Sequence, residues 1–146
     1  MKKTLLTSLG VAALAVSGAA NAHFQLVYTP DVIVEKPTNM NMKLVFGHPM
    51  ENGHVMDMDK PEQFFVQFKD KRIDLMNKLK PVSWAGPENT AKAYQADYRV
   101  KRNGDYVFAV VPAPYYEKGE DIYIQQITKS YVNKGGLPTG WEQPLE

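Results

Sequence analysis

Short runs in which apolar and polar residues alternate are the feature that most restricts how this chain can fold. An alternation of period two places successive side chains on opposite faces of a β-strand, and no window shows a sustained apolar period of 3.6 residues. Ten Gly and ten Pro in 146 residues supply frequent turns between the runs. The runs lie at 24–28, 40–46, 63–69, 72–78, 94–100, 106–110 and 122–132. This spacing predicts an immunoglobulin-like antiparallel β-sandwich of about seven strands.

The dipeptide Asn103-Gly104 lies between two of these alternating runs. Asn-Gly favours the tight turns that join antiparallel strands, because both residues tolerate a positive φ angle. We therefore predict a β-hairpin whose two strands flank this dipeptide.

The first 22 residues are typical of a cleavable secretory signal peptide. Lys2 and Lys3 precede an apolar stretch at 5–16, and Ala20-Asn21-Ala22 offers small residues where a signal peptidase cleaves. The apolar stretch is shorter than the roughly 20 residues that a membrane span needs. The sequence thus predicts export to a bacterial periplasm, without a membrane span in the mature chain. Residues 23–133 are then the β-sandwich, and residues 134–146 form a Gly- and Pro-rich linker or tail that leaves room for a further domain downstream.

Composition excludes several classes of function. With 17 Lys and Arg against 16 Asp and Glu, the net charge of +1 gives no basic footprint for nucleic acid. The absence of Cys excludes disulfides, thiolate zinc sites and iron–sulfur clusters. No zinc-protease helix, nucleophile elbow or phosphate loop is present. We therefore expect a protein that is not an enzyme.

Histidine at the predicted cleavage site suggests metal chemistry. Cleavage after Ala22 makes His23 the first residue of the mature protein. A free α-amine has a pKa of about 7.7–8.0, so a transition metal can displace its proton near neutral pH. The amine and the Nδ1 atom of His23 can then chelate one ion, which an internal histidine cannot do.

The other two histidines lie in a polar segment at 46–59 that follows a predicted strand. Imidazoles and thioethers together are typical ligands of transition metals. The segment also carries Glu51, Asp57 and Asp59, which we expect to be solvated. Met40 and Met42 share the parity of neighbouring core positions, so we assign them to packing. The candidate metal ligands are His23, His48, His54, Met50, Met56 and Met58.

A family resemblance rests on an ordered set of motifs along the mature chain. These motifs are His23-Phe24, Leu44-Val45-Phe46-Gly47-His48-Pro49, Met56-Asp57-Met58, Lys60-Pro61 with Phe64 and Val66, and Trp84. In them the chain resembles the periplasmic nickel/cobalt-uptake component family. The resemblance implies an immunoglobulin-like domain that binds a divalent nickel or cobalt ion and presents it to a membrane permease. It also implies that His23 and His48 are ligands.

The same residues are consistent with other functions. An amine with imidazoles suits Ni(II), Co(II), Cu(II) or Zn(II), whereas thioethers favour Cu(I). The main alternative is therefore a periplasmic copper carrier or resistance protein with an N-terminal histidine site. A copper monooxygenase and a purely structural or protein-binding β domain are further alternatives.

Overall fold

The computed structural model describes residues 23–48 and 53–136. Its first sheet consists of β1 (Phe24–Tyr28), β3 (Thr38–Gly47), β4 (Val55–Met56), β7 (Lys80–Ala85) and β8 (Thr90–Val100). Its second sheet consists of β2 (Ile33–Val34), β5 (Gln63–Phe68), β6 (Lys71–Asp74), β9 (Gly104–Val111) and β12 (Thr128–Lys134). A separate hairpin consists of β10 (Tyr115–Glu117) and β11 (Ile122–Ile124), and a short 3₁₀ helix spans Met76–Lys78. The predicted signal peptide, Met50, Glu51 and residues 137–146 lie outside the described residues.

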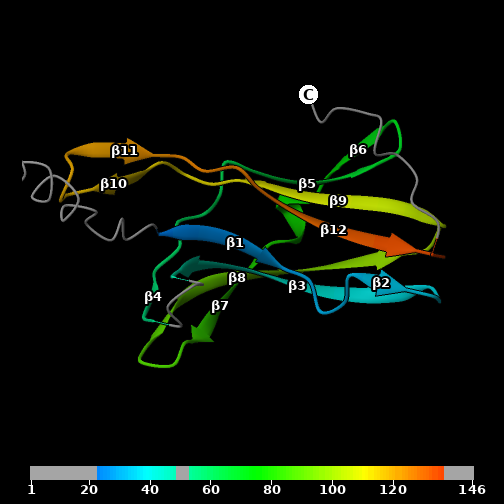
Figure 1. Ribbon diagram of the computed structural model, residues 1–146, viewed down its shortest axis with the longest axis horizontal. Helices are drawn as coiled ribbons and strands as arrows, with labels where there is room; N and C mark the ends of the chain where they lie inside the picture. The colour runs from blue at the N-terminus through cyan, green and yellow to red at the C-terminus, as the bar shows by residue number, and fades with distance from the viewer. Residues whose placement is uncertain (1–22, 49–52, 137–146) are drawn as a thin grey trace, which may run out of the picture.

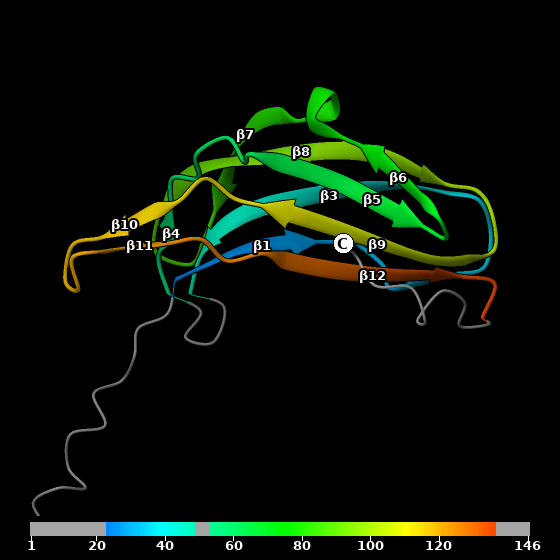
Figure 2. The ribbon, with the colours of Figure 1, turned by 90° about the horizontal axis from the view of Figure 1, so that it is seen from above.

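The two sheets pack face to face as a β-sandwich (Figures 1 and 2). The first sheet has the order β1-β3-β8-β7, with β4 also paired to β3, and the second has the order β2-β12-β9-β5-β6. All strand pairs of the two sheets are antiparallel except β2 with β12. This order corresponds to the A-B-E-D and G-F-C sheets of an immunoglobulin domain. The predicted fold class is confirmed.

Apolar side chains from both sheets fill the space between them. Met40 and Met42 of β3 are completely buried, and they face Phe64 of β5 and Phe108 of β9 in one core cluster. Full burial of one such side chain stabilises the fold by about 1.5–3 kcal/mol. The assignment of Met40 and Met42 to packing is confirmed.

The predicted hairpin at Asn103-Gly104 is wrong. The strands on either side, β8 and β9, belong to different sheets. Both edges of β8 are already paired with β3 and β7, and both edges of β9 with β5 and β12. The turn therefore carries the chain from one sheet to the other, and Gly104 supplies the φ of 132° that this crossing requires.

A hydrogen-bonded tyrosine fixes this crossing. The Tyr106 hydroxyl donates to the Arg102 carbonyl oxygen at 2.9 Å and accepts from the Arg102 N–H at 3.0 Å. Its position, two residues before the fully buried Phe108, matches the tyrosine corner of immunoglobulin domains. Phe108 stands where those domains have a disulfide cysteine, so apolar packing replaces the covalent link.

Further differences from the predicted strands concern short or irregular elements. The run at 122–132 is interrupted, and its two halves form β11 and β12. The run at 72–78 contributes only part of β6 before the 3₁₀ helix begins. Alternation did not reveal β2, β4, β7 or β10. Of these, β7 contains Pro81, which an edge strand tolerates because one side of its backbone is unpaired.

None of the helices in the described part of the chain has the length and apolar character that crossing a membrane requires. The β10–β11 hairpin extends from one end of the sandwich, next to the start of β1 (Figures 1 and 2). This end of the molecule carries the candidate site.

Candidate metal centre

Strand register places all three histidines of the chain in one row. In the last paired row, Gly47 of β3 lies opposite Phe24 of β1 on one side and Val55 of β4 on the other. Because the strands are antiparallel, the next row contains His48, flanked by His23 and His54. Adjacent residues in such a row have Cβ atoms about 4.5–5.5 Å apart and side chains on the same face.

This row faces the end of the core. Side chains alternate between the two faces of a sheet, so residues two positions apart along a strand lie on the same face. The histidines therefore lie on the same face as the row of Gln25, Phe46 and Met56. Phe46 belongs to the core cluster and is only 5% exposed. The His23 ring packs edge-on against Phe46, with ring centroids 6.0 Å apart. The histidines therefore form the polar end of an otherwise apolar layer.

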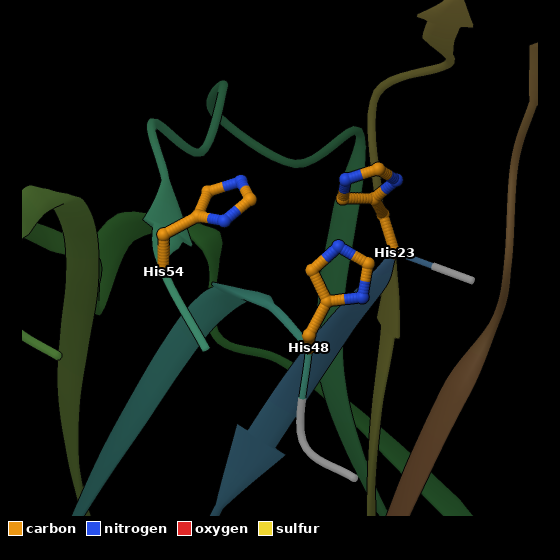
Figure 3. A group of neighbouring side chains, drawn as sticks. All are labelled: His23, His48 and His54. Atoms are coloured by element: carbon orange, nitrogen blue, oxygen red, sulfur yellow. The ribbon is translucent and has the colours of Figure 1, made fainter. Parts of the chain in front are cut away.

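The three imidazoles lie close enough to bind one ion. Ring centroids are 4.1 Å apart for His23 and His48, 5.5 Å for His48 and His54, and 6.3 Å for His23 and His54. One nitrogen of each ring lies within 4.8 Å of the others, and Figure 3 shows the rings grouped around a common space. Tetrahedral bonds of about 2.0–2.1 Å would require ligand atoms about 3.4 Å apart. Binding of one tetrahedral ion would therefore draw the three nitrogens closer together than they lie in this structure.

Burial and charge keep His23 in the neutral form that binds metals. The pKa of His23 is lowered mainly by burial and then by the neighbouring His48, with a smaller lowering from His54. The carboxylate of Glu117 opposes this by raising the pKa of His23. The net direction is downward, which favours the unprotonated imidazole near neutral pH.

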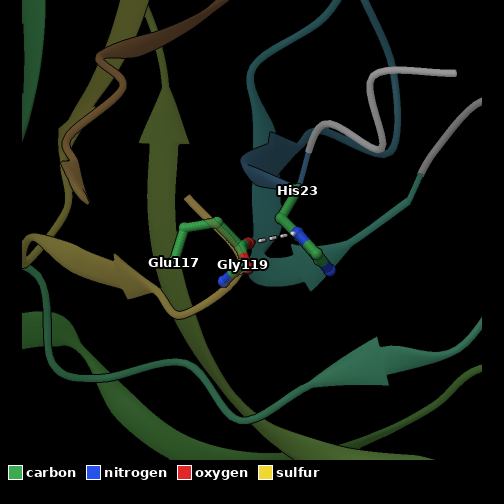
Figure 4. A network of polar contacts seen from close by, with 3 residues as sticks. All are labelled: His23, Glu117 and Gly119. Carbon is green, nitrogen blue, oxygen red and sulfur yellow. Dashed lines mark hydrogen bonds and ion pairs between the residues drawn. The ribbon is translucent and has the colours of Figure 1, made fainter. Parts of the chain in front are cut away.

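Glu117 is a site residue that sequence reasoning missed. It lies on the β10–β11 hairpin, and its Oε2 atom is 3.3 Å from Nδ1 of His23 (Figure 4). Burial, the Glu117 charge and a hydrogen bond with Glu117 also raise the pKa of the Tyr115 hydroxyl. No local sequence pattern marks this pair, because β1 and the hairpin are remote in sequence and meet only in the folded chain.

Side-chain hydrogen bonds hold β4, the short strand next to His54. The Asn89 amide pairs with both the N–H and the carbonyl oxygen of Val55, each at 2.8 Å. The Asp57 carboxylate, which the sequence suggested to be only solvated, accepts the N–H of Lys92 at 2.7 Å. These contacts imitate a strand pairing and fix where His54 lies.

The two candidate methionines within the described residues pack in or against the core. Met58 is completely buried within the core cluster, and Met56 is partly buried and packs against the same cluster. The enclosure of Met58 by apolar side chains favours a packing role for this residue. Met50 lies outside the described residues. Within the described residues, the candidate site consists of three imidazoles with the Glu117 carboxylate beside His23.

Comparison with curated proteins and with solved structures gave no match. Comparison with protein families gave one, a domain of unknown function designated DUF4198, which matches residues 20–146. This match includes every residue of the candidate centre and far more than half of the chain, and the protein therefore belongs to the DUF4198 family.

Proposed function

We propose that this protein binds a divalent nickel or cobalt ion in the periplasm and delivers it to a membrane uptake permease. The observation that carries the proposal is the row of His23, His48 and His54, which brings every histidine of the chain to one end of the sandwich. Export rests on the predicted signal peptide, and the choice of nickel or cobalt rests on the family resemblance described above.

The site suits capture and release of an ion without a chemical step. Neutral imidazoles are ligands of borderline softness that suit Ni(II), Co(II), Cu(II) and Zn(II). His54 is exposed, whereas His23 and His48 are half-buried. The ion is thus held from one side and accessible from the other, as a cargo must be if a permease is to remove it.

Copper is the second candidate for the cargo. Affinity for a given nitrogen site generally peaks at Cu(II) among divalent first-row metals, so three imidazoles alone favour copper. The burial of Met58 removes one of the thioethers that would favour Cu(I). A Cu(II) carrier therefore remains the alternative that a direct measurement should address.

Calorimetric titration of the exported protein with Ni(II), Co(II), Cu(II) and Zn(II) tests the proposal. We expect tight binding of one ion, with the ranking of the four metals choosing between nickel or cobalt and copper. Because loss of a residue that merely supports a ligand costs about 10–100-fold in affinity, loss of a ligand in His48→Ala should cost at least as much. The matched control is Asn41→Ala, which alters an exposed side chain elsewhere on β3.

Two further results would support the same function. Affinity should be weaker at about pH 5.5 than at about pH 7.5, because protons compete for the imidazoles. Cells that lack the protein should accumulate less nickel or cobalt, and His48→Ala should not restore uptake. Binding of no metal, or equal affinity in His48→Ala and the parent protein, would refute the proposal.

A further inference from the structure

The contact between His23 and Glu117 determines more than the local charge. Nδ1 of His23 lies 3.3 Å from Oε2 of Glu117, within reach of a hydrogen bond from an Nδ1–H group (Figure 4). The other nitrogen of the same ring faces His48 and His54 (Figure 3). A neutral imidazole has one N–H donor and one bare nitrogen. With the proton on Nδ1, the bare nitrogen is Nε2, and its lone pair faces the cluster.

The hairpin holds the carboxylate in place. The second oxygen of Glu117, Oε1, is 3.4 Å from the backbone N–H of Gly119 in the turn between β10 and β11. The side chains of His23 and Glu117 are only 16% and 23% exposed, so water competes weakly for their contact. The carboxylate is therefore aimed at the ring by the fold itself.

We propose that Glu117 is a positioning residue that fixes His23 as the Nδ1–H tautomer, so that Nε2 is the atom available to a metal. Rings that bind metals commonly donate their second N–H to a carboxylate, which orients the ring and raises its basicity. The part of this inference that concerns the metal rests on the proposed function.

A proton on Nδ1 of His23 is incompatible with the predicted N-terminal chelate. A chelate between the α-amine and the imidazole of His23 uses Nδ1, and it would have to break the contact with Glu117. Binding through Nε2 leaves the amine unused, because the amine and Nε2 lie too far apart to reach the same ion. Extending the chain before His23 should therefore abolish binding through the chelate but leave binding through Nε2 nearly unchanged.

The tautomer is measured directly, and without metal, by long-range proton–nitrogen NMR of the imidazole rings in the exported protein at about pH 8. We expect His23 to carry its proton on Nδ1 in the parent protein. Glu117→Ala should shift that proton to Nε2, and Glu117→Gln should largely retain it on Nδ1, because the amide oxygen still accepts. The matched control is Glu120→Ala, which removes an exposed carboxylate from the same hairpin and should change nothing.

Metal affinity gives the second readout. Glu117→Ala should weaken binding about 10–100-fold, while an extra Ala before His23 should leave it nearly unchanged. A proton on Nε2 of His23 in the parent, no response of the tautomer to Glu117→Ala, or loss of binding in the extended chain would each overturn the inference. A tautomer that responds in a protein that binds no metal would refute the proposed function and leave the positioning role intact.

Discussion

His23 makes the stability of the metal-free protein depend on pH. Its pKa is lowered in the folded chain, first by burial and then by His48, with Glu117 acting in the opposite direction. Below its usual pKa of about 6.5, the unfolded chain therefore binds a proton more readily than the folded chain. The contribution of neutral His23 to the free energy of unfolding is fully present above about pH 6.5. It is lost as the pH falls through about 6.5 toward the lowered pKa of the folded chain.

Urea unfolding of the metal-free protein at about pH 7.5 and about pH 5.5 measures this effect. The free energy of unfolding should be smaller at the lower pH, and His23→Gln should reduce the difference. Most carboxylates stay ionised across this interval, so the comparison reports mainly on histidine. An unchanged pH dependence in His23→Gln would contradict the prediction.

At the scale of elements, the position of His54 depends on β4, a strand too short to be stable by itself. The strand β4 has two residues, and the Asn89 side chain supplies both of its hydrogen bonds on the side away from β3. Each such bond contributes about 0.5–1.5 kcal/mol net. Asn89 is exposed, so its loss should affect the position of β4 more than the core.

We predict that Asn89→Ala weakens metal binding by up to about tenfold, the equivalent of about 1.4 kcal/mol, because His54 is no longer held beside His48. The free energy of unfolding should fall by less than the free energy of metal binding does. Calorimetry and urea unfolding of the same variant measure the two quantities. Asn41→Ala, which removes an exposed Asn–Asp contact on β3, is the control; equal affinities in both variants would contradict the role of Asn89.

At the scale of the whole molecule, the connection between β8 and β9 joins the two sheets at the far end from the site (Figure 1). Tyr106 is 2% exposed and makes two hydrogen bonds with Arg102 at this crossing. Tyr106→Phe keeps the ring but leaves both backbone groups without their partner. Its effect should appear in the stability of the entire sandwich rather than in metal binding.

We expect Tyr106→Phe to reduce the free energy of unfolding by about 1–3 kcal/mol, with metal affinity unchanged. Urea unfolding measures the loss. Tyr123→Phe is the matched control, because Tyr123 is 74% exposed and its change should lie within about 0.5 kcal/mol. A similar loss in both variants would show that the corner contributes nothing specific.

Local sequence patterns were enough to predict the strands with regular alternation and part of the core. Period-two patterns identified β1, β3, β5 and β9, because side-chain alternation is a local property of an extended chain. Met40 and Met42 were assigned to packing for the same reason. Residue chemistry also identified the three histidines as candidate ligands, since imidazole is recognisable wherever it lies.

Which residues lie in contact follows from the folding of the whole chain. The register between β1, β3 and β4 puts the histidines in one row, and a shift of one residue would move one of them to the opposite face. Asn103-Gly104 alone favours a hairpin between β8 and β9. These strands do not pair, because other strands already occupy both edges of each. Met58 belongs to the core and Glu117 contacts His23, because burial and contacts between distant segments depend on the packing of the whole chain and not on local sequence.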